Sequence, residues 1–571
     1  MSKVDEEEEE SLSADDLRNL PGHGIKRQDF PRDFDNAFSS AFPAESPRTN
    51  QKPVVKEALK GFLDEEKDVV MIDAPPGFGK SITIYTLLRM LNGDAYYATP
   101  LKSLQEQLVE DGFIGDNMTE IMGRSNYSCV LPEADPGTTV DVGKCQKDSD
   151  FDCPVKSECP YYHQKGLAID DSISVVNMSY LMSVPITMMD DDGQFSPRDV
   201  LVVDECQNIE SWAINFVGVT ISSNIMPDEL WDKLVWPEGD ALEDYDEVVD
   251  FLRYEVLEKA REMKSYYDGL QFKDEDQVGE AEDLQQLIDK IDRFLDDESE
   301  NHWVSQYDPI IKKNDPNEHR LRFKPIKVGR FLDDLLWSKA GKIVLASATI
   351  PKGNWLQEIG LQDADVKRLN VPSPFPIENR PIVVDEAVGK MTYDERKENM
   401  PDMVEKIKQI SHHHDGEKGI VHCRGYNYVE LFARTAKNMG ERDWFEENCV
   451  VQDRMDREGS LEEWVDGDKQ IFLSVNMSEG IDLKGDKCRW QVLLKAKYPN
   501  MNDDRVDYRI SEMNDWNWYN QQAVIQLEQA YGRAVRSSDD EAVFYILDGS
   551  AKSMIERSGD LFHDWFLEGV A

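Results

Sequence analysis

The sequence predicts an α/β protein of two domains, each built on a parallel β-sheet flanked by helices. A chain of 571 residues is too long for one hydrophobic core. In both halves short apolar runs alternate with amphipathic stretches, which is the pattern of strands and crossover helices in a parallel sheet. A proline-rich segment at 370–381, NVPSPFPIENRP, separates the two series and marks the domain boundary.

The predicted strands before that boundary are residues 68–74, 95–100, 172–178, 199–205 and 342–348. Those after it are residues 381–386, 419–424, 449–453, 470–475, 490–498 and 542–548. Two long interruptions break the first series, and we expect both to be insertions. We therefore divide the chain into an acidic disordered leader, 1–30; domain 1, 31–370, interrupted by a cysteine-containing unit, 125–165, and a helical arch, 215–335; and domain 2, 371–571.

Acidic residues dominate the whole chain. Asp and Glu number 113 against 64 Lys and Arg, which gives a net charge of −49. Such a surface indicates adaptation to a high-salt cytoplasm, because the Debye length falls to about 3 Å at 1 M salt and self-repulsion is then screened. The 12 Trp and 22 Phe residues argue against a disordered acidic chain. No apolar stretch could span a bilayer and no signal peptide is evident, so we expect a cytoplasmic protein that binds no membrane.

Residues 71–83, MIDAPPGFGKSIT, form a strand, a glycine loop and a helix start in that order, which is a phosphate-binding arrangement. Glycines let backbone N–H groups approach phosphate oxygens. Lys80 would reach the β- and γ-phosphates of ATP, and the Ser81 hydroxyl would hold Mg²⁺. The alternative is a loop that binds no nucleotide. The expected ATP contacts are Ala74, which stands where a glycine is usual, and Pro75, Pro76, Gly77, Phe78, Gly79, Lys80 and Ser81.

A second predicted strand ends in the paired carboxylates Asp204 and Glu205. Asp204 can hold Mg²⁺ through water, and Glu205 can orient or deprotonate the attacking water. Asp385 and Glu386 repeat the local pattern, but they begin domain 2 and read as a strand end. We favour 204 and 205 because they share a domain with Lys80.

Four of the eight cysteines fall in one short window with the spacing C-x15-C-x7-C-x5-C. Four thiolates suit a [4Fe–4S] cluster or Zn²⁺, since both favour sulfur ligands. The paired C-x2–4-C spacing of structural zinc is absent, and cysteines without metal are the third alternative. The candidate ligands are Cys129, Cys145, Cys153 and Cys159.

Several further segments occur in a familiar order. FPAESPRTNQ (42–51) precedes the glycine loop, and ATPLKSLQEQ (98–107) follows it. Ser347-Ala348-Thr349 comes after a strand, SVNMSEGIDLKGD spans 474–486, and QAYGRAVRS spans 529–537. From about residue 42 to 550 the chain resembles the XPD/DinG family of superfamily 2 iron–sulfur DNA helicases, in a form expected of a halophilic archaeon or its virus. The resemblance implies two RecA-like domains and favours the [4Fe–4S] cluster over zinc.

Carried over by position, the resemblance implies roles for individual residues. Gln51 would read adenine, Gln529 would orient groups at the γ-phosphate, and Arg533 and Arg536 would be arginine fingers on neighbouring turns of a helix; an exposed basic helix face is the alternative for these two. The motif Asp-Glu-Cys-Gln departs from the family's Asp-Glu-Ala-His, so Gln207 must take over the coupling role of the family's histidine or leave it altered. The residues expected to couple domain 2 to the nucleotide are Glu479, Gly480 and Asp482.

Two basic islands, 319–330 and 483–498, stand out against the acidic background as candidate surfaces for a nucleic-acid backbone. The alternative is that their bases pair with nearby acids. The resemblance implies single-stranded DNA and duplex junctions as partners and 5′→3′ movement, and we expect a monomer. The sequence leaves the pathway open between repair, replication and a virus's own genome. An RNA helicase or remodeller and a nucleotide-binding sensor without turnover stay open. The candidate DNA contacts are Arg320, Arg322, Phe323, Lys324, Lys487 and Arg489.

Overall fold

A computed structural model describes the chain from residue 29 to residue 570. The residues outside this description are 1–28, 101, 111, 113, 148–150, 185–194, 224, 271–273, 313–314, 386, 476–482, 484, 538–539 and 571. Within the described part the chain forms two parallel sheets and one small antiparallel sheet. No helix of the described residues has the length and apolar character needed to cross a membrane.

The first parallel sheet confirms the α/β prediction for domain 1. Its strands lie in the order β10 (Val366–Asn370), β1 (Val69–Asp73), β9 (Ala340–Ser347), β5 (Arg198–Asp204), β2 (Ala95–Thr99), β4 (Ile173–Asn177) and β3 (Thr119–Ile121). All neighbouring pairs are parallel. The carboxyl ends of β1, β5 and β9 therefore meet at one edge, where the glycine loop, Asp204 and Ser347 follow.

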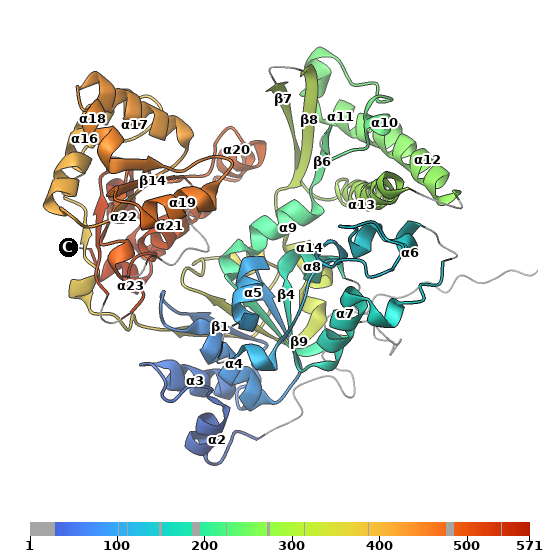
Figure 1. Ribbon diagram of the computed structural model, residues 1–571, viewed down its shortest axis with the longest axis horizontal. Helices are drawn as coiled ribbons and strands as arrows, with labels where there is room; N and C mark the ends of the chain where they lie inside the picture. The colour runs from blue at the N-terminus through green and yellow to red at the C-terminus, as the bar shows by residue number, and fades with distance from the viewer. Residues whose placement is uncertain are drawn as a thin grey trace, which may run out of the picture.

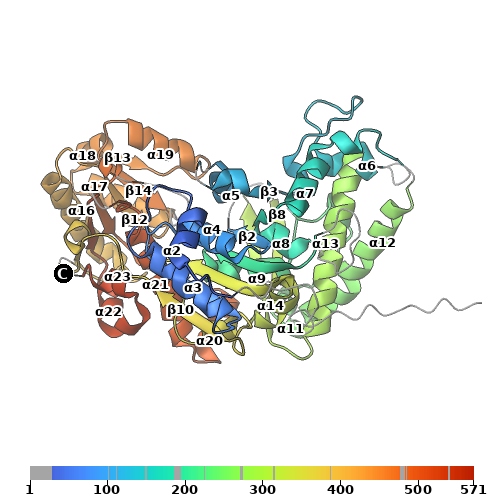
Figure 2. The ribbon, with the colours of Figure 1, turned by 90° about the horizontal axis from the view of Figure 1, so that it is seen from below.

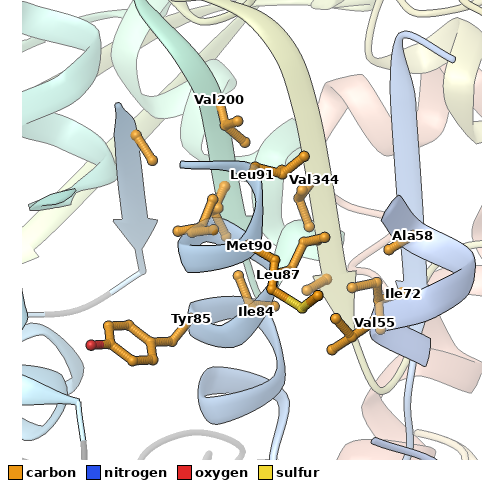
Figure 3. Close-up of a cluster of buried hydrophobic side chains, with 14 of the residues drawn as sticks. Val55, Ala58, Ile72, Ile84, Tyr85, Leu87, Met90, Leu91, Val200 and Val344 are labelled. Atoms are coloured by element: carbon orange, nitrogen blue, oxygen red, sulfur yellow. The ribbon is translucent and has the colours of Figure 1, made fainter. Parts of the chain in front are cut away.

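The helices of domain 1 cover both faces of this sheet (Figure 1). Helix α4 follows the glycine loop and packs Ile84, Leu87 and Leu91 against Ile72 of β1 and Val344 of β9 (Figure 3). These aliphatic side chains are almost fully buried, each contributing about 1.5–3 kcal/mol of burial. The helices are α2 (Phe34–Ala41), α3 (Gln51–Leu63), α4 (Lys80–Leu91), α5 (Lys102–Glu110), α6 (Lys144–Lys147), α7 (Pro160–Asp170), α8 (Met178–Ser183), α9 (Ile209–Val217), α14 (Gly329–Leu335) and α15 (Trp355–Glu358).

The second parallel sheet belongs to domain 2. Its order is β11 (Ile382–Val383), β16 (Val543–Ile546), β15 (Trp490–Leu493), β12 (Gly419–Cys423), β14 (Ile471–Val475) and β13 (Cys449–Val451). All five pairings are parallel. The helices are α16 (Arg396–His413), α17 (Tyr426–Asn438), α18 (Arg442–Asn448), α19 (Arg457–Asp466), α20 (Asp504–Ser511), α21 (Trp516–Tyr531), α22 (Gly549–Arg557) and α23 (Asp564–Leu567).

Residues 219–325, which we call the arch unit, lie within the predicted insertion 215–335, which we expected to be largely helical. They contain α10 (Asp228–Trp231), α11 (Tyr245–Phe251), α12 (Leu257–Asp268) and α13 (Glu275–Asp297), together with an antiparallel sheet of β6 (Val219–Ser222), β8 (Asp315–Pro325) and β7 (Trp303–Lys312). The reason is a period-two pattern in β8. Leu321 and Phe323 face the arch core, and Arg320, Arg322 and Lys324 alternate with them.

The two views agree on the arrangement of these parts (Figures 1 and 2). In both views domain 2, in orange and red, lies to the left and the arch unit, in green, to the right, and domain 1 packs against both. Helix α20 of domain 2 reaches across to strand β7 of the arch unit. Domain 2 therefore contacts both other parts of the molecule.

Candidate nucleotide site

The glycine loop lies between β1 and α4, as the sequence predicts. Gly77 and Gly79 have φ values of 75° and 85°, which favour glycine. Neither position has room for a side chain, because a Cβ on Gly77 would lie 2.2 Å from Cζ of Phe375 and one on Gly79 would lie 2.6 Å from Nε2 of Gln51. Conformation and crowding thus both require glycine, and the loop ends at the first helical residue, Lys80.

Lys80 faces the paired carboxylates across the edge of the sheet. Its Nζ lies 3.4 Å from Oε1 of Glu205. Burial alone would lower the pKa of Lys80, but the charges of Glu205 and Asp204 raise it above its usual value. Burial also raises the pKa of Asp204 to about 6. The Tyr97 hydroxyl lies 3.4 Å from Oδ2 of Asp204 and also interacts with Ser81, so the two proposed Mg²⁺ ligands flank one phenol.

Gln207 connects the carboxylate pair to the Ser-Ala-Thr segment. Its amide donates from Nε2 to Oε2 of Glu205 at 2.9 Å and accepts from the Ser347 hydroxyl at 2.5 Å. The Ser347 hydroxyl in turn accepts from the backbone N–H of Thr349. Glu205 has a left-handed conformation, φ 50°, which turns the chain into this network. The amide of Gln207 thus links Glu205 to Ser347, and its taking over the coupling role of the histidine in Asp-Glu-Ala-His stays a prediction.

Domain 2 approaches the same loop from the other side. A Cβ on Gly532 would lie 2.6 Å from Cγ of Pro76, and one on Gly77 would lie 3.1 Å from the backbone oxygen of Arg536. Arg536 is close enough to Lys80 to oppose the rise in the lysine's pKa. Burial would raise the pKa of Glu205, but Lys80, the Gln207 hydrogen bond and Arg533 hold it below its usual value.

The two arginines do not lie on a helix, contrary to our expectation. Helix α21 ends at Tyr531, and its C-cap residue Gly532 packs against Pro76. Arg533 and Arg536 follow in a turn and an irregular segment. The helix ends where the chain meets the glycine loop, so the guanidinium groups are placed by the loop contact and not by helical spacing. Gln529 lies on the last turn of α21, and its Oε1 accepts from Nε2 of Gln526 at 3.4 Å.

Gln51 is buried beneath the glycine loop. Its Nε2 donates to the carbonyls of Phe78 and Gly79 at 3.1 and 3.3 Å, and its Oε1 accepts from the backbone N–H of Arg48 at 2.7 Å. The Arg48 guanidinium also donates to the Gly77 carbonyl at 2.6 Å. Both ends of the Gln51 amide are thus engaged with protein here, and adenine recognition by this residue stays a prediction.

A buried histidine joins the two domains beside this site. Nε2 of His563 lies 3.2 Å from Oδ2 of Asp73, the last residue of β1, and Nδ1 lies 2.8 Å from Oε2 of Glu528 on α21. Burial opposes the imidazolium, but Glu528 and Asp73 raise the pKa of His563 to about 10. The imidazolium of His563 thus links Asp73, at the end of β1, to Glu528, the neighbour of Gln529 on α21.

This contact makes stability depend on pH. The folded protein holds a proton on His563 that the unfolded chain, with a histidine pKa of 6.5, releases. The contribution is therefore complete below about pH 6.5 and is lost as the pH rises towards about 10. We expect the melting temperature to fall across this range, and His563→Gln to remove that part of the fall. Melting curves at about pH 7, 8.5 and 10 measure it, with the exposed His412→Gln as control. Equal pH dependence in both variants would contradict the expectation.

Residues 407–568 match the helicase C-terminal domain family. Over 257 residues the chain is 26% identical to the ATP-dependent DNA helicase DinG of Photobacterium profundum, a match that covers 42% of this chain and only 36% of that protein. The structure of S. tokodaii Xpd4 has a TM-score of 0.55 at 16% identity, covering 92% of this chain and 99% of its own. An XPD helicase structure has a TM-score of 0.58 at 14% identity, covering 92% and 100%. The chain has the XPD helicase fold.

The XPD fold confirms the prediction of two RecA-like α/β domains. The two domains bring Arg536 close enough to Lys80, and Arg533 close enough to Glu205, to influence their pKa values, although these residues are far apart in the chain. Asp385, the alternative carboxylate, is exposed on domain 2 and pairs with Lys552. The predicted coupling residues Glu479, Gly480 and Asp482 lie outside the described residues.

All four clustered cysteines of this XPD-like chain line one cavity of about 150 Å³. Burial raises the pKa of Cys145, and the nearby Cys153 and Cys129 raise it further. Among the described residues, no group of three or more His, Cys, Asp or Glu side chains stands in metal-ligand geometry. The donor set fits a sulfur-ligated group chemically, while the side chains here are not drawn together around one.

The basic islands are mostly paired with acids, as the alternative held. Asp308 pairs with Arg320 at 3.1 Å and with Arg322 at 2.5 Å, and Lys324 pairs with Asp503 of domain 2. Phe323 is fully buried in the arch core, so it offers no ring to a base and our expectation for it is wrong. In the second island Arg489 pairs with Asp486 and Asp540, and Lys487 lies in the adjacent 3-10 turn.

Sequence reasoning missed four residues that shape the site: Arg48, Tyr97, Phe375 and His563. Arg48 stands three residues before Gln51, so the local sequence held a signal for it. Tyr97 and Phe375 were inside segments that we recognised, but their side-chain contacts depend on strand order and on the linker path. His563 carries no local signal, because its partners lie at distant positions in the chain.

Proposed function

We propose that the protein is an ATP-dependent DNA helicase that moves along single-stranded DNA and separates duplex strands. One observation carries the proposal. Lys80, Asp204 and Glu205 of domain 1 and Arg533 and Arg536 of domain 2 converge on one glycine loop. Phosphoryl transfer from ATP needs this combination, because charge develops on the γ-phosphate and must be neutralised from both sides.

Each residue has a distinct role in hydrolysis. Lys80 would bind the β- and γ-phosphates, and Ser81 with Asp204 would hold Mg²⁺, which would supply positive charge at the phosphates when bound. Glu205 orients the attacking water and accepts its proton, which suits a carboxylate kept ionised by its neighbours. Arg533 and Arg536 stabilise the transition state from domain 2, and Gln529 orients groups at the γ-phosphate. Gln207 is hydrogen-bonded to both Glu205 and Ser347, so a movement of the Glu205 carboxylate during hydrolysis is transmitted to Ser347.

Hydrolysis drives movement because the site is divided between two domains. ATP binding closes the cleft, and product release reopens it. Alternating grip of the two domains on the strand converts this cycle into translocation, in the 5′→3′ direction that the family resemblance implies. The protein acts as a cytoplasmic monomer at high salt, where its charge of −49 is screened.

The four cysteines that share one cavity support a [4Fe–4S] cluster as a structural cofactor. Cys129, Cys145, Cys153 and Cys159 would hold it, and it would order a segment with few helices and strands. Zinc is the other group that four thiolates suit. The absence of paired C-x2–4-C spacing favours the cluster.

The decisive experiment measures phosphate release in molar KCl with no nucleic acid, with single-stranded DNA and with single-stranded RNA of the same sequence. We expect stimulation by DNA that exceeds stimulation by RNA, together with unwinding of a duplex that carries a 5′ single-stranded tail. Stronger stimulation by RNA would transfer the proposal to an RNA helicase. ATP binding without phosphate release under all three conditions would indicate a nucleotide-binding sensor.

A further inference from the structure

A buried cluster of ion pairs lies at the far end of α21 from the nucleotide site. Its centre is Glu210, in the first turn of α9 and five residues after Glu205. Oε1 of Glu210 accepts from Arg505 and, at 3.0 Å, from Arg509, and Oε2 accepts from Nε1 of Trp518 at 2.9 Å. Arg509 is 0% exposed and Arg505 only 5%. Burial would raise the pKa of Glu210, but the two guanidiniums lower it, so the carboxylate is charged.

The cluster ties three parts of the molecule together. Glu210 and Glu358 belong to domain 1, and Glu358 accepts from Arg509 at 3.0 Å. Arg505 donates to the carbonyls of Pro325 and Ile326, at the base of the arch unit, at 3.0 and 2.8 Å. Both arginines belong to α20 of domain 2. Because removing one partner from a buried ion pair leaves an uncompensated charge, these contacts resist separation.

The same cluster fixes the beginning of α21. Asp515 is the N-cap of this helix, and its side chain accepts from the backbone N–H of Trp518 and from the Arg509 guanidinium at 2.5 Å. The Trp518 ring also lies 4.2 Å from the Arg509 guanidinium carbon. Cap, first turn and ion pairs therefore hold one end of the helix against domain 1.

The other end of α21 carries the domain 2 part of the nucleotide site. The helix has 16 residues, which gives a length of about 24 Å. It ends at Tyr531. Gly532 follows against Pro76, and Arg533 comes next, close enough to Glu205 to lower the pKa of that carboxyl. A helix of this length is stiff, so a displacement at its first turn moves the guanidinium groups at its far end.

We infer that Glu210 is a positioning residue for ATP hydrolysis, which acts through α21 by setting where Arg533 stands relative to the glycine loop. The inference deepens the proposed function and rests on it. The side chain of Glu210 bonds to Arg505, Arg509 and Trp518, at the end of α21 away from the glycine loop. Its role is to hold α20 and α21 at a fixed point on domain 1, close in sequence to the carboxylate pair whose chemistry Arg533 assists.

The test compares Glu210→Gln with the wild-type protein. Glutamine keeps the shape and an acceptor for Trp518 but loses the charge that holds the two arginines. We expect kcat for ATP to fall about 10- to 100-fold, because a displacement near 1 Å costs about that much in a positioned site. KM should change by less than about threefold, because the interaction is made in the transition state. Affinity for ADP with aluminium fluoride should fall, while affinity for ADP alone stays.

A double variant distinguishes positioning from general damage. If Glu210 acts through Arg533, Glu210→Gln/Arg533→Ala should have the same kcat as Arg533→Ala alone, whereas independent effects would multiply. Trp518→Phe removes one hydrogen bond without burying a new charge, and it should show the same pattern more weakly if Glu210→Gln does not fold. Arg261→Gln, in an exposed ion pair of the arch unit, is the control and should match wild type.

Three results would overturn the inference: an unchanged kcat in both Glu210→Gln and Trp518→Phe, multiplying effects in the double variant, or equal losses of ADP and aluminium fluoride binding. Wild-type protein that hydrolyses no ATP would overturn the proposed function, and the inference with it. Active wild-type protein with unaffected variants would overturn the inference alone.

Discussion

Replacing Lys80 by alanine should reduce ATP hydrolysis to the background of the assay and abolish unwinding with it. The lysine ammonium lies 3.4 Å from Glu205, at the start of the helix whose first N–H groups would face the phosphates of bound ATP. Loss of one such preorganised positive group costs about 10²–10³ in kcat, and loss of phosphate binding adds to this. Phosphate release with single-stranded DNA present measures the effect.

Two further measurements make this result specific. The Lys80→Ala protein should keep part of its DNA binding, because the proposed function assigns Lys80 to the nucleotide and not to the strand. Lys60→Ala, in an ion pair with Glu57 on the outside of α3, removes the same charge away from the site and should leave hydrolysis unchanged. DNA-stimulated hydrolysis retained in Lys80→Ala would count against the motor.

Replacing Cys153 by serine should remove the iron from the protein. Purified without oxygen, the wild-type protein should be brown and contain about four irons and four sulfides per chain. The four thiols line one cavity, so a serine at one position leaves three sulfur ligands for the proposed cluster and should let iron dissociate. Visible absorption together with iron and sulfide analysis measures the loss independently of helicase activity.

The control for this change is a cysteine outside the cavity. Cys449→Ala replaces a buried thiol of domain 2 and should keep the full iron content. A colourless wild-type protein with one zinc would replace the cluster by a zinc site. Iron retained fully in Cys153→Ser would exclude this residue as a ligand.

Most strands could be predicted from the sequence because each is a short apolar run buried on both faces. Strand β10, VKRLN, was not predicted, because it lies at the edge of the sheet and three of its five residues are charged or polar. The sheet of the arch unit was not predicted. Basic side chains alternate with the buried Leu321 and Phe323 along β8, and we interpreted this segment as a nucleic-acid contact and not as a strand. Phe323 was wrongly assigned to DNA binding, although the alternation of apolar and basic residues along β8 already indicated that its side chain is buried.

The residues of the candidate site likewise fall into those that the local sequence predicts and those that it does not. Lys80, Asp204 and Glu205 lie in local motifs at the carboxyl ends of strands, and local sequence was enough to find them. The approach of Arg533 and Arg536 was expected from family order, but their helical placement was wrong, because the end of α21 depends on the Gly532–Pro76 contact. His563 and Glu210 act through partners distant in sequence, which no periodicity reveals.

The place of His563 in the chain bears on how the protein is made. Asp73 emerges early from the ribosome, whereas His563 emerges only after almost every other described residue. Domain 1 can therefore acquire its glycine loop long before the imidazole that joins it to α21 exists. Nascent chains that have not reached these residues should bind nucleotide without the arginines in place, so the proposed hydrolysis should require synthesis to continue past His563.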